Sequence, residues 1–218
     1  MEGVSQIIAE YSAIIRNGGF FAYVILLIWA SGIAIAVERF FALFRKYDVD
    51  GASFMNEIQR YVLSNDLQGA IRICSGTTAA LPRVLKAGLK RAKQNEKQIQ
   101  NGLDAAAFEM IPKVESKLNY MGLLAAISTL AGLIGTIHGL MGAFAGVGSA
   151  DPAQRAELLS KGMSEVMGTT FLGLCSAITI MVLHTFLSTK AGKITAEIDE
   201  YSIKLLDLLV TKEGSTED

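Results

Sequence analysis

Three long runs without Asp, Glu, Lys or Arg constrain the fold of this chain more than any other feature of its sequence. They cover residues 20–37, 121–147 and 166–189, which makes them 18, 27 and 24 residues long. An α-helix needs about 20 mainly apolar residues to cross the hydrocarbon core of a bilayer. We therefore predict an all-α membrane protein with three transmembrane helices, whose long helices extend into a helical cytoplasmic segment.

The first run has an alternative interpretation as a cleaved signal peptide. It lies near the N-terminus, and Ala34-Ile35-Ala36 matches the A-x-A pattern of a cleavage site. The run is longer than a usual signal-peptide core, however, and two further hydrophobic runs follow it. These features favour a first transmembrane span at 20–37.

Basic residues near the spans predict the orientation of the chain, because cytoplasmic segments carry an excess of Lys and Arg. The segment 38–120 contains 13 of them, whereas the first 19 residues contain only Arg16 and the segment 148–165 only Arg155 and Lys161. The predicted organisation is a periplasmic N-terminal segment (1–19), the first span (20–37), a cytoplasmic helical domain (38–120), the second span (121–147), a periplasmic loop (148–165), the third span (166–189) and a cytoplasmic C-terminal helix and tail (190–218).

Within the cytoplasmic domain, two residues predict helix boundaries and a third predicts a bend. Gly76 is placed to end one helix, and Pro82 suits the first turn of the next. The helical pattern then continues from about Gln98 into the second span, so we expect Pro112 to bend a long helix without ending it.

The composition excludes several classes of function. The net charge of -1 does not favour nucleic-acid binding, which needs a surplus of basic residues on one surface. Cys74 and Cys175 do not have the spacing of metal ligands, and no cofactor motif is present. Ser176 and His184, which would suit an intramembrane hydrolase, are eight residues apart on one helix, about 12 Å along its axis. An enzyme is therefore disfavoured.

Small residues follow one face of the second span. They recur at steps of three and four, as Ser128 does before them, and are Gly132, Gly135, Gly139, Gly142 and Gly146. Close approach of backbones over small residues drives helix association in lipid. This glycine face is therefore a predicted helix contact, either with the third span or with another subunit.

Hydroxyl groups follow the third span. Thr169, Ser176 and Thr179 continue a helical stripe that begins at Glu165, and Thr170 lies beside it. A single Ser or Thr in a membrane helix often only bonds to its own backbone. Several of them after an acid indicate a hydrated or proton-linked passage, for which His138 in the second span is a candidate relay residue. His184 lies near the end of the third span, where anchoring is the simpler role.

Two segments resemble the signatures of a known family. Residues 130–141, LAGLIGTIHGLM, are similar to its LLGLLGTVxGM motif, and residues 162–174, GMSEVMGTTFLGL, to its GIxEALxxTAxGL motif. The family is that of the MotA/TolQ/ExbB proton channels, in its ExbB/TolQ branch. A flagellar-type stator subunit is disfavoured because that branch has four spans.

The resemblance implies a homo-oligomer, a pentamer, in the bacterial inner membrane. Its second and third helices would line a pore that holds the helix of an ExbD/TolR-like partner, with a TonB/TolA-like envelope-spanning protein as a further partner. By position, Thr136 and Thr170 match pore-lining threonines, and Glu165 matches the acid of the motif. Thr179 stands where the family usually has proline, and Ser128-Thr129 replace a usual Ala-Pro, which leaves the branch and the client process open.

None of the three spans contains a carboxylate. An unpaired charge inside the bilayer costs several kcal/mol, so proton transfer needs a titratable group or a water wire near the middle. We expect the partner to bring an aspartate, and this chain to be the scaffold of a motor driven by the proton-motive force. The alternative is a non-conducting scaffold for a membrane assembly or signalling complex.

Overall fold

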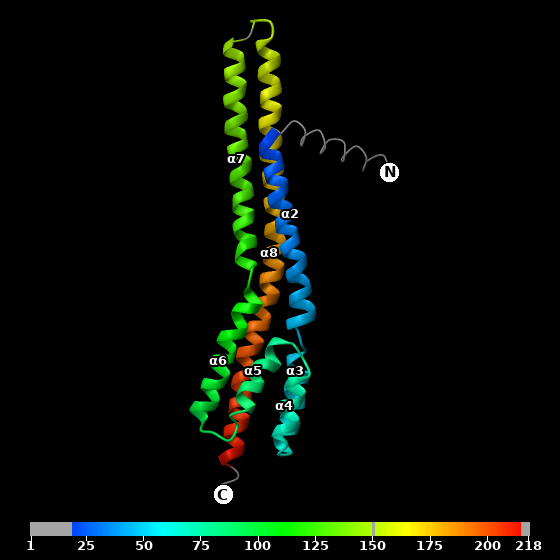
Figure 1. The fold of residues 1–218 in the computed structure, drawn as a ribbon, viewed down its shortest axis with the longest axis vertical. Helices are drawn as coiled ribbons and strands as arrows, with labels where there is room; N and C mark the ends of the chain where they lie inside the picture. The colour runs from blue at the N-terminus through cyan, green and yellow to red at the C-terminus, as the bar shows by residue number, and fades with distance from the viewer. Residues whose placement is uncertain (1–18, 150, 215–218) are drawn as a thin grey trace, which may run out of the picture. The chain divides into compact units, whose positions relative to one another are not determined.

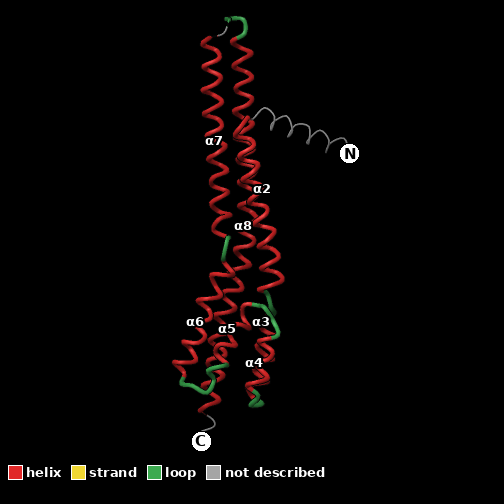
Figure 2. The backbone as a smooth tube through the Cα atoms, viewed as in Figure 1, coloured by secondary structure: helices red, strands yellow, loops and turns green. Residues whose placement is uncertain are grey.

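A computed structural model describes residues 19–149 and 151–214, apart from the side chains of Ser149, Glu165 and Glu213. All regular structure in this part of the chain is helical, with no strand (Figure 2). Three of its helices are long and apolar enough to cross a membrane. The predicted fold class is therefore confirmed, whereas the predicted N-terminal segment lies outside the described residues except for Gly19.

The chain folds into two compact units. The first, here called the membrane unit, contains the residues up to Val37 together with Asn119–Thr185. The second, the charged unit, contains Glu38–Leu118 and the residues from Phe186 onward. Helices α2 and α8 contribute residues to both.

The membrane unit is built from α2 (Gly19–Phe41), α7 (Leu118–Ser149) and α8 (Arg155–Gly214). Figure 1 shows α7 and the first part of α8 as a hairpin with α2 alongside. The core of this unit combines side chains from all three helices, namely Ala22, Ile25, Ile28, Ala131 and Leu172. Helical structure covers most of the segment predicted as a loop at 148–165, because α8 already begins at Arg155.

Many large apolar side chains of the membrane unit point outward. Phe20 is 74% exposed, Met167 is 71% exposed and Leu27 is 70% exposed. A protein surrounded by water rarely exposes so much apolar surface, whereas lipid or neighbouring subunits can cover it.

The charged unit contains short amphipathic helices packed beside the later part of α8 (Figure 1). They are η1, a π-helical segment (Ala42–Tyr47), α3 (Gly51–Leu63), α4 (Leu67–Ser75), α5 (Ala80–Leu89) and α6 (Glu96–Glu115). Consecutive helices from α3 to α6 pack on one another, and α5 also contacts η1.

Capping residues explain where these helices begin and end. Asp66 caps α4 by accepting the backbone N–H of Gly69 at 2.8 Å, and Asn95 caps α6 by accepting that of Gln98 at 3.0 Å. Gly76 follows the last residue of α4, and α5 starts two residues before Pro82. Both predicted boundaries are therefore confirmed.

The predicted continuous helix from Gln98 into the second span is wrong. Pro112 lies inside α6, but that helix ends at Glu115 and α7 starts at Leu118. Between them Ser116 has an extended ψ of 146°, and Lys117 has a positive φ of 65°, which residues other than glycine rarely adopt. We call Ser116 and Lys117 the α6–α7 joint.

Two side chains at the end of α2 hold this joint. Arg39 donates hydrogen bonds through Nη1 to Ser116 Oγ at 2.7 Å and to the carbonyl oxygen of Lys113 at 3.4 Å. Lys117 Nζ donates to both carboxylate oxygens of Glu38 at 2.6 Å. Because the partners are more than 70 residues apart in sequence, local helical pattern cannot predict this break.

Candidate functional site

Helices α7 and α8 come into backbone contact at a pair of glycines. A Cβ atom added to Gly173 would lie 2.9 Å from Gly132 Cα and 2.9 Å from the carbonyl oxygen of Ser128. A Cβ on Gly132 would lie 3.2 Å from the carbonyl oxygen of Thr169. No side chain fits between the two helices here, because the atoms that an added Cβ would meet belong to the backbone of the other helix.

Two buried serines bridge the same crossing. The hydroxyls of Ser128 and Ser176 are hydrogen-bonded to each other, and Ser176 also donates to the carbonyl oxygen of Gly173 at 3.0 Å. Ser128 is fully buried and Ser176 nearly so. These hydroxyls therefore satisfy one another inside the subunit, and neither is paired with a histidine as a hydrolase would require.

The predicted glycine face divides into two parts. A Cβ on Gly135 would lie 3.0 Å from Thr169 Oγ1, and one on Gly139 would lie 2.8 Å from Val166 Cγ2. A Cβ on Gly142 or Gly146 would meet nothing within 4 Å among the described residues. The first part of the face, including Gly132, thus packs closely against α8 of the same chain, whereas Gly142 leaves room for a side chain.

The candidate threonines also differ in their surroundings. Thr136 and Thr170 are partly exposed beside the α7–α8 contact, and they donate to the carbonyl oxygens of Leu133 (2.6 Å) and Val166 (3.4 Å). Each hydroxyl oxygen keeps lone pairs that can accept a further hydrogen bond. Thr169, which is 1% exposed, packs against Gly135 and faces the interior of its own subunit.

Thr179 lies on another side of α8. It is nine residues from Thr170, which corresponds to about 180° around an α-helix. Its side chain lines a mainly apolar groove of about 390 Å³ between α2 and α8, together with Trp29 and Cys175. Thr170 and Thr179 therefore cannot line one straight passage, although the sequence pattern had placed them in the same group.

His138 is an exposed residue of α7. Its ring lies 5.5 Å from the ring of Phe21, measured between centroids. It borders a hollow of about 290 Å³ that Lys161, Gly142 and Gly146 also line. His184 is partly buried, with Gly122 nearby. The relay role of His138 stays a prediction, and the side chain of Glu165 lies outside the described residues.

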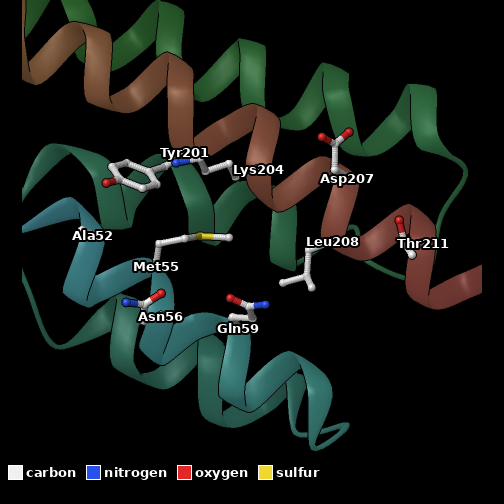
Figure 3. Close-up of a pocket in the computed structure, with 9 residues that line it drawn as sticks. All are labelled: Ala52, Met55, Asn56, Gln59, Tyr201, Lys204, Asp207, Leu208 and Thr211. Atoms are coloured by element: carbon white, nitrogen blue, oxygen red, sulfur yellow. The ribbon is translucent and has the colours of Figure 1, made fainter.

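The charged unit holds a groove of mixed polar and apolar lining that the sequence did not reveal. It has a volume of about 500 Å³ between α3 and α8, with Met55 and Leu208 in the space between the helices and Asn56 and Gln59 along one side (Figure 3). Lys204 at its edge donates a hydrogen bond to Glu200 at 2.5 Å, which raises the pKa of Lys204. Among the described residues no cluster of His, Cys, Asp and Glu could hold a metal ion.

Acid is expected to weaken the α6–α7 joint. The hydrogen bond from Lys117 holds the pKa of Glu38 below its ordinary value of 4.5, and Arg39 acts in the same direction. A depressed pKa in the folded state stabilises the fold above the unfolded pKa, and this contribution is lost as pH falls through the folded pKa. The melting temperature of the wild type should therefore fall more steeply than that of Glu38→Gln between about pH 5 and pH 3. If the melting temperatures of the two proteins fell in parallel with pH, the ion pair between Glu38 and Lys117 would not contribute to the stability of the fold.

Comparison with known proteins identifies the family. Residues 77–200, more than half of the chain, match the model of the MotA/TolQ/ExbB proton channel family. The chain belongs to this family. The matched range runs from the segment before α5 into the charged part of α8, so it contains the whole α7–α8 contact of this family member. The family is one of channels and not of enzymes.

Curated relatives support the ExbB/TolQ branch. The chain is 24% identical over 189 residues to a putative biopolymer transport protein ExbB homolog of Methanothermobacter thermautotrophicus, an alignment that covers 86% of this chain and 65% of the relative. It is 25% identical to the biopolymer transport protein ExbB of Salmonella typhimurium, in an alignment that covers 80% of this chain and 78% of the relative. It is 26% identical to the Tol-Pal system protein TolQ of Haemophilus influenzae, in an alignment that covers 49% of this chain and 48% of the relative. The chain thus spans less than two thirds of the first of these relatives. The predicted family and branch are confirmed.

Proposed function

We propose that this ExbB/TolQ-type chain is the scaffold subunit of a proton channel in a bacterial inner membrane, and that the channel converts the proton-motive force into mechanical work. Its N-terminus would be periplasmic and its C-terminus cytoplasmic, as the distribution of Lys and Arg predicts. The energised partners would be an ExbD/TolR-like single-span protein and a TonB/TolA-like protein.

The observation that carries this proposal is the combination of a tightly packed α7–α8 pair with the lack of an acid inside the spans. The pair is held by direct backbone contact at Gly132 and Gly173, which gives a rigid wall. The spans 20–37, 121–147 and 166–189 contain no Asp or Glu. A rigid wall without a titratable carboxylate is suited to enclose a partner helix that carries one.

Thr136 and Thr170 are the residues of this wall that we assign to the passage. Both flank the buried contact, and both hydroxyl oxygens can accept a hydrogen bond from water or from a protonated carboxyl group. Thr169 and Thr179 have other surroundings, so Thr169 would position the two helices and Thr179 would face α2. Neutralisation of the partner's aspartate by a proton lowers the cost of moving it past an apolar wall, which couples proton flow to movement.

The membrane unit also suits assembly into a homo-oligomer, which we take to be a pentamer. Gly142 continues the glycine face, and among the described residues no atom lies within 4 Å of a Cβ placed on it. Large exposed side chains such as Met141 and Phe144 lie on the same helix. A neighbouring subunit or lipid would cover this surface.

The test of the proposal is proton flux through the assembled complex. Thr170→Val combined with Glu165→Ala should lower the flux into liposomes by about ten-fold, because the two hydrogen-bonding groups removed from the passage are worth about 0.7 kcal/mol each. The flux would be followed with a pH-sensitive dye under an imposed membrane potential, with this chain and its single-span partner reconstituted together.

Thr179→Val is the matched control for Thr170→Val, since it removes a threonine hydroxyl from the other side of the same helix. Its flux should equal that of the wild type. An unchanged flux in the Thr170→Val, Glu165→Ala variant would contradict the proposal and favour the non-conducting scaffold. An equal loss in Thr179→Val would place the passage beside α2.

A further inference from the structure

The segment that follows the first span has two opposite faces. Helix α2 continues into the π-helical segment Ala42–Tyr47. Leu43 and Tyr47, four residues apart, are buried in the charged unit, whereas Phe44, Arg45 and Lys46 are exposed. The buried pair fixes the segment, so its outward face has a defined composition of one aromatic and two basic side chains.

Aromatic rings extend this outward face. The ring of Phe44 stacks on that of Phe40, with centroids 4.6 Å apart, and on that of Phe186 at 6.0 Å. Phe41 beside them is 54% exposed and Phe186 is 57% exposed. Exposed rings at the end of a membrane span fit the boundary between acyl chains and headgroups, where their apolar surface is covered.

Two acidic groups close to this segment are paired with basic side chains, and the carboxylate of a third, Asp50, accepts a hydrogen bond from Ser53. Glu38 pairs with Lys117 and Arg39, and Asp48 pairs with Lys190 at 2.7 Å. Among the described residues, no ion pair is formed by Arg45 or Lys46. The segment therefore presents two basic side chains without an ion pair next to its aromatic cluster, and the ammonium group of Lys46 lies 5.5 Å from the centre of the Tyr47 ring.

We infer that this face binds anionic phospholipid, with Arg45 and Lys46 on the headgroup phosphate and the phenylalanine cluster against the acyl chains. An Arg guanidinium can bind phosphate oxygens through two parallel hydrogen bonds, and Lys adds a point charge. Basic residues next to a span attract anionic lipid in preference to zwitterionic lipid. The site would hold the end of the first span at a fixed depth in the membrane.

Lipid binding to the purified full-length chain tests this inference. The delipidated protein in detergent would be titrated with phosphatidylglycerol or with phosphatidylcholine of the same acyl chains, and bound lipid would be counted by native mass spectrometry. The wild type should prefer phosphatidylglycerol. Arg45→Gln combined with Lys46→Gln should weaken phosphatidylglycerol binding by about 25-fold, at about five-fold for each basic side chain.

The matched control is Lys93→Gln combined with Lys97→Gln, which removes two exposed basic residues from another part of the charged unit. It should leave the affinity for phosphatidylglycerol unchanged, and both variants should keep the wild-type melting temperature. Equal affinity for the two lipids, an equal loss in the control variant, or displacement of the lipid by inorganic phosphate would each overturn the inference.

Discussion

Gly173→Ala should lower the free energy of unfolding by about 1–3 kcal/mol, the usual cost of adding a methyl group to a well-packed contact. The new Cβ would lie 2.9 Å both from Gly132 Cα and from the carbonyl oxygen of Ser128. Both are backbone atoms, so no side-chain rotation can relieve the overlap and the two helices must move apart. That movement would also stretch the hydrogen bond between Ser128 and Ser176. Unfolding in mixed detergent micelles measures the change.

Gly192→Ala and Gly142→Ala are controls for this substitution. A Cβ at either position meets nothing within 4 Å. For Gly192 on α8 the substitution should stabilise the chain by about 0.5–1 kcal/mol, because alanine restricts the unfolded state. For Gly142 the expected change lies in the size of the oligomer, since another subunit would meet the new methyl group. A loss of stability in Gly192→Ala as large as that in Gly173→Ala would show that glycine itself, and not the helix contact, is responsible.

Arg39→Ala is the second substitution with a large expected effect, a loss of about 2–3 kcal/mol of stability, as is typical for hydrogen bonds that involve a charged group. The side chain is 6% exposed and donates to Ser116 and to the carbonyl oxygen of Lys113. Without it, the α6–α7 joint loses the donor that ends α6. Cleavage by trypsin after Lys117 should become faster, because the joint opens more often.

Two further variants separate the role of Arg39 from a general effect of charge. Arg39→Lys keeps the charge but lacks the forked geometry of the guanidinium, so it should restore less than half of the lost stability. Arg72→Ala removes an exposed arginine from α4 and should stay within about 0.5 kcal/mol of the wild type. Full recovery in Arg39→Lys would contradict the proposed hydrogen-bonded joint.

Helix boundaries with a local cause were predictable from the sequence. Pro82 fixes φ at its own position in the first turn of α5, and Gly76 directly follows the last residue of α4, so both were placed correctly. The break at Ser116 and Lys117 was not predictable, because its partners lie at the end of α2. Lys117 adopts a positive φ that its residue type does not favour, and a contact made elsewhere in the chain compensates for it.

In the candidate site, too, some features follow from the local sequence and others from contacts between distant residues. The glycine pattern of the second span predicted a contact face, since spacing of three and four places residues on one side of any helix. It did not show that this contact uses Gly132, Gly135 and Gly139 within the chain and leaves Gly142 without a neighbour. Gly173, at which an added Cβ would meet the backbone of α7, was visible only as part of a family motif.

Hydrophobic run length was sufficient to predict three membrane spans, because the thickness of the bilayer sets how many apolar residues a helix needs. The family, too, could be read from short motifs in two of these spans. Neighbouring threonines, in contrast, differ by about 100° around a helix, and only the position of α7 reveals that Thr169 is buried and Thr170 is partly exposed. Which hydroxyl meets water depends on how the helices pack, and packing arises from contacts between residues that the linear pattern does not relate.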